Sequence, residues 1–303
     1  MADTSRAPRV RRRIHDTLIV GSGFTGIGTA IKLVQAGVDD VVIVERSDRV
    51  GGTWRDNTYP GAACDIPSLL YSFSFAQNPD WSRAYSPAGE ICQHIEGLVD
   101  HFDLRRRIRF GVEVNGLSFD ETEGIWTVKT KGRTTYRART VVLASGPLPD
   151  HKLPDIRGID TYEGTVIHSA RWDHGYDFSG KRVAVVGTGA SAVQIVPELV
   201  KAADFVKVFQ RTPGWVIPRM DVPIPPAAQE LFAKVPVTQQ LARQALYWGH
   251  EISATALVWD SPLTGLVARL GKAHLRRQVK DPWLRRQLTP NFTPGCKRML
   301  VSS

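Results

Sequence analysis

Cysteine is scarce in this sequence. Only Cys64, Cys92 and Cys296 occur in 303 residues, and no two of them form a CxxC pair. An odd number of isolated cysteines does not form a full set of disulfides, which favours a reducing compartment over secretion. A disulfide reductase needs a close redox pair, and a thiolate metal site needs clustered ligands. We therefore expect a cytoplasmic protein that is not a disulfide reductase and has no metal site.

Long apolar runs are also lacking. The stretch TLIV at residues 17–20 ends at Gly21, and the apolar stretch around Leu257 and Val258 is interrupted by Asp260. A membrane helix needs about 20 predominantly apolar residues, and a signal peptide needs an apolar core of about 7–15 residues. We expect no signal peptide and no stable membrane insertion.

Acidic residues are fewer than basic ones, 30 against 39, which gives a net charge of +9. Much of the excess is local, in the first thirteen residues and at residues 105–109. Such charge runs are usually solvated, and no basic motif interleaved with aromatic residues accompanies them, so we expect no nucleic-acid partner. The charge also suits a phosphorylated cofactor. With 42% hydrophobic and 23% charged residues, the chain is typical of a globular protein long enough for two domains.

The first motif is a dinucleotide-binding pattern. The expected strand DTLIV runs into GSGFTG and then into apolar residues at helical spacing. In this pattern Gly21 permits a tight turn, Gly23 leaves room for a pyrophosphate at the helix N-terminus, and Gly26 lets helix and strand pack closely. A second expected strand, DDVVIVE, ends at Glu45, 24 residues after Gly21. A carboxylate there can accept a hydrogen bond from a ribose hydroxyl. The alternative is a glycine loop without a ligand.

A second module repeats this plan. The segment KRVAVVGTGASAVQIVPELV is followed by the expected strand FVKVFQ, then by Arg211 and Thr212. Arg211 stands 24 residues after the first glycine of this module, so we expect it at the position that Glu45 has in the first module. An arginine can bind a 2′-phosphate through two hydrogen bonds, whereas a carboxylate would repel this phosphate. We predict an unphosphorylated ribose in the first module and NADP in the second, unless Arg211 is only a solvated charge. The three glycine positions hold Gly187, Gly189 and Ala192.

Two dinucleotide modules in one chain indicate electron transfer from NADPH to FAD. The fold class that we predict is α/β, with two dinucleotide-binding (Rossmann-like) modules and a helical insertion. TVVLASG, residues 140–146, has the pattern of a buried strand that completes the first module, and a proline-rich exit follows it.

The domain boundaries that we expect follow these patterns. The helical insertion is indicated by AAQELFAKV and LTGLVARLGKAHLRRQV. The expected parts are a basic disordered leader (1–13), an FAD-binding module that is incomplete without a C-terminal part (14–150), a linker (151–180), an NADP-binding module (181–222), the helical insertion (223–293) and the start of a return to the NADP module (294–303).

The linker contains the string YEGTVIHSARWD. It resembles the FxGxxxHxxxW(P/D) fingerprint of Baeyer-Villiger monooxygenases at Gly164, His168, Trp172 and Asp173, with Tyr162 in place of the usual phenylalanine. Monooxygenases that oxidise nitrogen or sulfur carry a related string, but with Tyr or Phe and then a basic residue where Trp172 and Asp173 stand. A third interpretation is a linker whose His and Trp only pack against their neighbours.

Other segments extend the resemblance over nearly the whole chain after the leader. Residues 51–75, GGTWRDNTYPGAACDIPSLLYSFSF, resemble the flavin-contacting segment of that family. Ala63 departs from it, because several members have an arginine two residues before the aspartate. The residues that carry this match are Gly51, Gly52, Thr53, Trp54, Tyr59, Pro60, Gly61, Asp65 and Tyr71.

Two further segments resemble the parts of this family that bind NADP. FQRTPGWVIPR resembles the family's exit from the NADP-binding strand, and TPGCKRMLVSS resembles the segment in which a Lys-Arg pair reaches the cofactor. The resemblance puts Lys297 beside Arg211 and Thr212 around the 2′-phosphate. It makes Arg298 and Asp65 the catalytic residues, with Asp65 orienting Arg298. Alternatively, Asp65 only caps a turn and Lys297 is solvated.

The resemblance implies oxygen insertion beside a ketone carbonyl. NADPH reduces FAD, O2 adds at flavin C4a, and the peroxyflavin attacks a small-molecule ketone to give an ester or lactone. Arg298 suits the anionic peroxide because an arginine is never deprotonated and has several donors. The alternatives are an N- or S-oxidising monooxygenase and an inactive cofactor-binding fragment. All expected cofactor contacts are Gly21, Gly23, Phe24, Gly26, Glu45, Gly52, Thr53, Trp54, Asp65, Tyr71, Gly187, Thr188, Gly189, Ser191, Ala192, Arg211, Thr212 and Lys297.

One expectation concerns completeness. TVVLASG has no counterpart in the second module, in which only MLVSS follows the helical insertion. In the resembled family a long C-terminal stretch completes both domains. We expect the 303 residues alone to hold FAD weakly, not to turn over unless the remainder is supplied in trans, and to self-associate through an incomplete sheet.

Overall fold

The computed structural model describes residues 9–132, 134–147, 151–258, 262–295 and 299–302. Its backbone contacts divide the chain into two compact units. The first comprises Met1–Thr58 and Gly89–Arg171, and the second comprises Tyr59–Ala88 and Trp172–Ser303.

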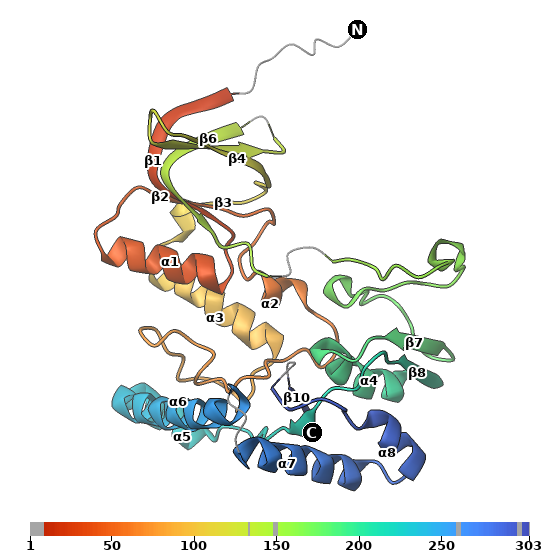
Figure 1. Cartoon of the computed structure of the whole chain (residues 1–303). Helices are drawn as coiled ribbons and strands as arrows, with labels where there is room; N and C mark the ends of the chain where they lie inside the picture. The colour runs from red at the N-terminus through yellow and green to blue at the C-terminus, as the bar shows by residue number, and fades with distance from the viewer. Residues whose placement is uncertain (1–8, 133, 148–150, 259–261, 296–298, 303) are drawn as a thin grey trace. The chain divides into compact units, whose positions relative to one another are not determined.

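The first unit contains a six-stranded sheet in the order β3-β2-β1-β6-β5-β4. Figure 1 labels β1, β2, β3, β4 and β6 of this sheet. β1 pairs in parallel with β2 and β6, and β2 pairs in parallel with β3. β5 runs antiparallel to both β6 and β4. The predicted α/β class is confirmed by this mixed sheet, parallel from β3 to β6, and its helices. The strands are β1 (Arg9–Val20), β2 (Val41–Val44), β3 (Ile108–Arg109), β4 (Val114–Asp120), β5 (Ile125–Thr130) and β6 (Thr134–Leu143).

Three helices belong to this sheet's connections: α1 (Phe24–Gln35), α2 (Thr53–Asp56) and α3 (Ala88–His101). α1 packs against β1 and β2. It does so with Ile27, Ala30 and Ile31, which recur at helical spacing and are buried. All four residues of β2 are buried, as expected for a parallel strand covered on both faces. A short 3-10 turn, η1 (Arg105–Arg107), precedes β3.

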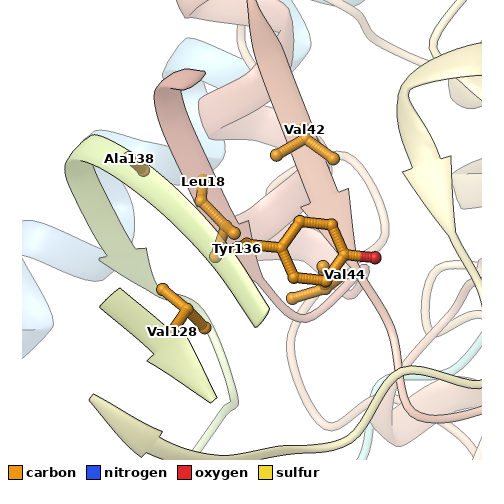
Figure 2. Packing of buried hydrophobic residues seen from close by; sticks show 6 residues of the cluster. All are labelled: Leu18, Val42, Val44, Val128, Tyr136 and Ala138. Atoms are coloured by element: carbon orange, nitrogen blue, oxygen red, sulfur yellow. The ribbon is translucent and has the colours of Figure 1, made fainter. Parts of the chain in front are cut away.

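The apolar core of this sheet fixes the strand ends that carry the first motif. Figure 2 shows a buried cluster from β1, β2, β5 and β6. Burying one Leu or Val side chain contributes about 1.5–3 kcal/mol, so the cluster holds β1 and β2 firmly in register. Gly21 and Glu45 directly follow these two strands. The cluster consists of Leu18, Val42, Val44, Val128, Tyr136 and Ala138.

The expected disordered leader is wrong for residues 9–13. β1 begins at Arg9, and Arg9 and Val10 pair with the first two residues of β6. The register shifts between Val10 and Ile14, after which pairing continues. Strand pairing uses backbone groups and does not require apolar side chains, so a basic segment can extend a strand beside an available neighbour.

The strand predicted from TVVLASG is the end of β6, but it is less buried than expected. Val141 and Val142 are half-buried, and Leu143 is 64% exposed. Its backbone still pairs with β1, so the strand forms without full burial.

The second unit has its own β-α-β motif. β7 (Arg182–Val186) pairs in parallel with β8 (Phe205–Phe209), and α4 (Ala190–Ala202) connects them. A separate parallel pair joins β9 (Val216–Pro218) and β10 (Leu300–Ser302). The 3-10 turns η2 (Ile159–Thr161) and η3 (Ser169–Arg171) belong to the first unit and precede β7 in the sequence.

In the described parts of the chain between β9 and β10 there are four helices. They are α5 (Pro226–Lys234), α6 (Pro236–Val258), α7 (Pro262–Gln278) and α8 (Pro282–Leu288). Each begins with proline, which suits the first helical position because its fixed φ fits and its missing N–H has no intrahelical partner there. Asp281 caps α8 by accepting a hydrogen bond from the Leu284 N–H at 2.8 Å. Within the described ranges, no helix is both long and apolar enough to cross a bilayer.

Residues 59–88 belong to the second unit, although we expected them within the 14–150 module. Arg83 Nε lies 3.1 Å from Asp221 Oδ2, and Gln229 Nε2 donates to the Trp81 carbonyl at 3.0 Å. Trp81 is 1% exposed, so it belongs to the core of this unit. These contacts join positions far apart in sequence, so sequence motifs do not predict them.

Candidate functional site

The first glycine loop accepts no side chain at two positions. Gly21 has φ +105°, and a Cβ there would lie 2.5 Å from the Ala144 carbonyl oxygen. A Cβ on Gly26 would lie 1.9 Å from the Gly21 carbonyl oxygen. The Gly21 N–H donates to the Val44 carbonyl at 2.8 Å and so connects the end of β1 to the end of β2. The loop therefore has the tight turn and the close helix packing that the motif predicted.

Two bare backbone segments face each other beside this loop. Gly23 precedes Phe24, the first residue of α1, and no side chain caps this helix. A Cβ on Gly23 would meet only the Gly52 Cα, at 3.7 Å, and Gly52 has φ +54°. The N–H groups at the start of α1 have no intrahelical acceptor, so they can bind a pyrophosphate. This geometry fits a dinucleotide.

Glu45 is buried directly beneath the loop, with 5% of its surface exposed. Its Oε2 accepts hydrogen bonds from Ser22 N–H at 2.9 Å and Ser22 Oγ at 2.7 Å. Its Oε1 accepts from Ser47 N–H at 3.0 Å and lies 3.2 Å from Arg55 Nη1. Burial acts to raise the pKa of Glu45, but the hydrogen bonds from Ser47 and Ser22 and the charge of Arg55 outweigh it, so this pKa is lowered. The carboxylate is ionised.

Arg55 is a site residue that the sequence did not reveal. It is buried, and its Nε and Nη2 donate to the two carboxylate oxygens of Asp56 at 2.8 and 3.0 Å. Its Nη1 also donates to the Arg49 carbonyl at 2.8 Å. The sequence shows that Arg55 is followed directly by Asp56, between Trp54 and Tyr59 of the flavin-like segment. This adjacency alone does not show that Arg55 is buried against Glu45.

The predicted flavin-contacting segment begins beside this cluster. Thr53 is exposed at the start of α2. Trp54 is half-buried, and its backbone N–H donates to the Gly51 carbonyl at 3.2 Å. A Cβ on Gly51, which has φ +119°, would lie 2.7 Å from Cys92 Sγ. Cys92 is buried, and burial raises the pKa of its thiol. This cysteine therefore packs as an apolar residue.

The second glycine loop differs from the first in its register. In the first module, Val20 directly before the loop pairs with Val44, the residue before Glu45. In the second, Val186 directly before the loop pairs with Phe209, the residue before Gln210. Gln210 therefore takes the position of Glu45, and Arg211 stands one residue further on. The predicted equivalence of Arg211 and Glu45 is wrong. Both residues lie 24 positions after the first glycine of their module, but the segment between the two paired strands differs in length between the modules.

The loop itself has the expected backbone. Gly187 has φ +111°, and its N–H donates to the Phe209 carbonyl at 2.9 Å. Thr188 Oγ1 lies 3.5 Å from the Thr212 carbonyl oxygen. Gly189 precedes α4, and Ser191 and Ala192 lie in its first turn. Arg211 is exposed, while Thr212 is half-buried.

A cavity of about 310 Å³ borders this loop. Thr188 and Gln210 line it on the sheet side, and Lys272 and His274 line it from α7, with Trp215 among the apolar residues. It lies at the carboxyl ends of β7 and β8, where ligands bind in open α/β sheets. Its volume is in the range of small-molecule sites.

Gln194 joins the flavin-like segment to α4 within the second unit. Its Oε1 accepts from Tyr59 Oη at 2.9 Å and from the Ala63 N–H at 3.3 Å. Its Nε2 donates to the Ala63 carbonyl at 2.9 Å. Gly61 has φ +80°, and a Cβ there would lie 2.8 Å from the Gln194 carbonyl oxygen. This link was not predictable from the motifs, because its two sides are more than 130 residues apart in sequence.

The predicted catalytic pair is only half described. Asp65 is half-buried, as is Tyr71, whose N–H donates to the Pro67 carbonyl at 3.0 Å. Lys297 and Arg298 lie outside the described residues, so their roles stay predictions.

The fingerprint crosses the division between the two units, which falls between Arg171 and Trp172. In the first unit, His168 Nδ1 accepts from the Ala170 N–H at 3.1 Å. Burial, and then the charges of His151 and Arg171, lower the pKa of His168. Tyr162 is 61% exposed, and Gly164 is exposed as well.

The second half of the fingerprint has structural contacts. Trp172 stacks on Phe178 at a ring separation of 5.6 Å and packs against the buried cluster at Tyr59. Asp173 Oδ1 accepts from the Gly175 N–H at 2.9 Å, which closes a turn. No group of three potential ligands that could hold a metal occurs in the part of the chain that the structure describes.

Comparison with known proteins gives consistent matches. A Baeyer-Villiger monooxygenase of Streptomyces coelicolor is 48% identical over 94% of this chain and 55% of its own length. A Baeyer-Villiger monooxygenase of Pseudomonas aeruginosa is 41% identical over 94% of the chain and 54% of its own length. The crystal structure of OTEMO in complex with FAD and NADP matches with a TM-score of 0.82 and 27% identity, covering 97% of this chain and 63% of that one.

The chain thus spans about half the length of the curated relatives that it matches. The family described as pyridine nucleotide-disulphide oxidoreductase matches residues 18–245, which include both glycine loops and the fingerprint. The chain belongs to this pyridine nucleotide-disulphide oxidoreductase family. Over 94% of its length it is also similar to the Baeyer-Villiger monooxygenases of Streptomyces coelicolor and Pseudomonas aeruginosa.

Proposed function

We propose that this chain is the cofactor-binding part of an FAD- and NADPH-dependent Baeyer-Villiger monooxygenase. The observation that carries the proposal is the difference between the two glycine loops. Buried, ionised Glu45 lies beside the first loop, and Gln210 followed by exposed Arg211 lies beside the second. The first loop favours a ribose with free hydroxyls, and the second favours a ribose that carries a phosphate.

FAD fits the first loop. The N–H groups at the start of α1 and the bare backbone of Gly23 and Gly52 would hold its pyrophosphate, and Glu45 would accept from its ribose. A 2′-phosphate would be repelled by the Glu45 carboxylate. Phe24, Thr53 and Trp54 are the remaining contacts that we propose in this unit.

NADP fits the second loop. Its pyrophosphate would lie over Gly187 and Gly189 at the start of α4, and Arg211 with Thr212 would bind the 2′-phosphate. The cavity lined by Thr188 and Gln210 has room for part of this cofactor. Ser191, Ala192 and Lys297 complete the contacts that we propose.

FAD, when bound and reduced by NADPH, supplies the redox chemistry with O2. This chain supplies binding and charge. We propose Arg298 as the permanent cation beside the reacting oxygen, with Asp65 as the residue that orients it. We propose Tyr71 as a further cofactor contact. A small-molecule ketone is the substrate that the names of the relatives support.

Product analysis tests the reaction. The chain is incubated with FAD, NADPH and a panel of ketones, amines and sulfides under ¹⁸O2, alone and together with the portion of the Streptomyces coelicolor relative that this chain does not match. We expect an ester or lactone that carries one ¹⁸O atom, and its loss in Arg298→Ala with FAD binding retained. Amine or sulfide oxides would instead support the N- or S-oxidising alternative. Bound FAD without any oxygenated product in either arm would support an inactive cofactor-binding chain.

Self-association is a further part of the proposal. Among the residues that the structure describes, β7 and β8 form a sheet of two strands, and Val186, Phe205 and Phe209 on it are about half exposed or more, at 60%, 48% and 49%. Strand edges and apolar surface of this kind favour pairing with another chain. Sedimentation velocity over a range of concentrations tests this, and a concentration-independent monomer would contradict it.

A further inference from the structure

The Glu45 carboxylate has no spare acceptor position. A carboxylate offers about four lone-pair sites. Oε1 faces the Ser47 N–H at 3.0 Å and Arg55 Nη1 at 3.2 Å, and Oε2 faces the Ser22 N–H at 2.9 Å and Ser22 Oγ at 2.7 Å. Any further donor must therefore replace one of these four.

Three of the four donors are fixed. The Ser47 and Ser22 N–H groups belong to the backbone, and the Ser22 backbone is held in the glycine turn by its neighbour Gly21. Arg55 is held by both oxygens of Asp56 and by a backbone carbonyl. Only the Ser22 hydroxyl can turn away, because a single rotation about χ1 redirects it.

The Ser22 hydroxyl and a ribose hydroxyl are chemically the same kind of donor. We propose that they compete for one acceptor position on Glu45 Oε2, so that Ser22 lowers the affinity of the first loop for FAD, while Arg55 holds the carboxylate in place as one hydroxyl replaces the other. This rests on the proposed assignment of FAD to the first loop. Ser22 is 0% exposed and Glu45 is 5% exposed, so there is little space for both hydroxyls at this oxygen.

The substitution Ser22→Ala removes the competing hydroxyl and keeps the backbone donor. We expect the dissociation constant for FAD, measured by quenching of flavin fluorescence, to fall between about threefold and tenfold, as for the loss of one competing hydrogen bond. Thr29→Ala is the matched control. It removes a hydroxyl from the same loop-helix segment, but this hydroxyl donates to the Thr25 carbonyl at 2.7 Å and not to Glu45. We expect no change in FAD affinity for this variant.

Displacement of FAD by ADP shows whether the effect depends on the ribose. ADP has both ribose hydroxyls, and 2′,3′-dideoxy-ADP has neither. We expect Ser22→Ala to tighten ADP binding by the same factor as FAD binding and to leave the dideoxy analogue unchanged. A change in general loop stability would alter the binding of both nucleotides alike.

The outcomes separate this inference from the proposed function. If the wild-type chain binds FAD and Ser22→Ala binds it equally or more weakly, competition is wrong and the FAD assignment stands. Equal tightening of ADP and its dideoxy analogue also overturns the competition. If the wild-type chain does not bind FAD at all, both ideas are overturned.

Discussion

Replacing Arg55 by methionine removes the cation from the buried cluster at Glu45. The side chains of Arg55 and Glu45 are each 6% exposed, and Arg55 also neutralises Asp56, which is 25% exposed. Removing one partner of a buried ion pair costs about 3–5 kcal/mol, because the other charge stays buried and unpaired. We expect Arg55→Met to lower the free energy of unfolding by this amount.

Urea unfolding followed by circular dichroism measures the loss. The matched control is Arg105→Met, which breaks an ion pair with Asp100 in the same unit. There the two side chains are 55% and 62% exposed, so we expect a loss below about 1 kcal/mol. Similar small losses in both variants would refute the idea that burial makes Arg55 important.

The pH dependence gives a second check. A carboxyl whose pKa is lowered by folding stabilises the protein above its unfolded pKa, and this contribution is lost as the pH falls through its folded pKa. The pKa of Glu45 is lowered, so its paired carboxylate stabilises the wild type at neutral pH. In Arg55→Met, protonation relieves the unpaired charge. The difference between the two proteins should therefore narrow as the pH falls toward about 4, and the double variant Arg55→Met with Glu45→Gln should recover part of the loss.

Three further predictions concern other positions. Arg211→Ala should weaken NADPH binding roughly 10- to 100-fold, the value of a charge-assisted hydrogen bond, and leave NADH nearly unchanged; equal effects on both would contradict the phosphate contact. Gly26→Ala should abolish FAD binding and lower the free energy of unfolding, measured with urea, by about 1–3 kcal/mol, because the new Cβ would lie 1.9 Å from the Gly21 carbonyl oxygen. Gly97→Ala is the control: its Cβ would meet nothing within 4 Å, so we expect it to raise the free energy of unfolding by about 0.5–1 kcal/mol. Burial lowers the pKa of His94 from 6.5 to about 4, so stability should fall as the pH drops through this interval, since only the unfolded chain binds the proton; the same slope in His94→Gln would contradict this.

The sequence predicted the first loop well because its requirements are local. Gly21 needs a positive φ, and Gly26 needs close contact one helical turn later, so both constraints lie within six residues. Glu45 follows β2 directly, and its position depends only on the pairing of β1 with β2. Arg55 was missed because its burial depends on how a later segment returns to that carboxylate.

The second loop shows where equal spacing fails. Arg211 has the same sequence distance from its first glycine as Glu45, but the strand pairing assigns that position to Gln210. A sequence does not show that the path from the first glycine to the end of the second strand is one residue shorter in the second module than in the first. The link from Gln194 to Tyr59 and Ala63 depends on contacts across more than 130 residues and was equally invisible.

Calorimetric titration of both cofactors into one set of variants tests the central claim, that the two loops bind different dinucleotides. We expect Glu45→Gln to weaken FAD binding and leave NADP binding unchanged, and Arg211→Ala to weaken NADP binding and leave FAD binding unchanged. If both variants weaken the same cofactor, or if neither changes any affinity, the assignment of FAD to the first loop and NADP to the second is wrong.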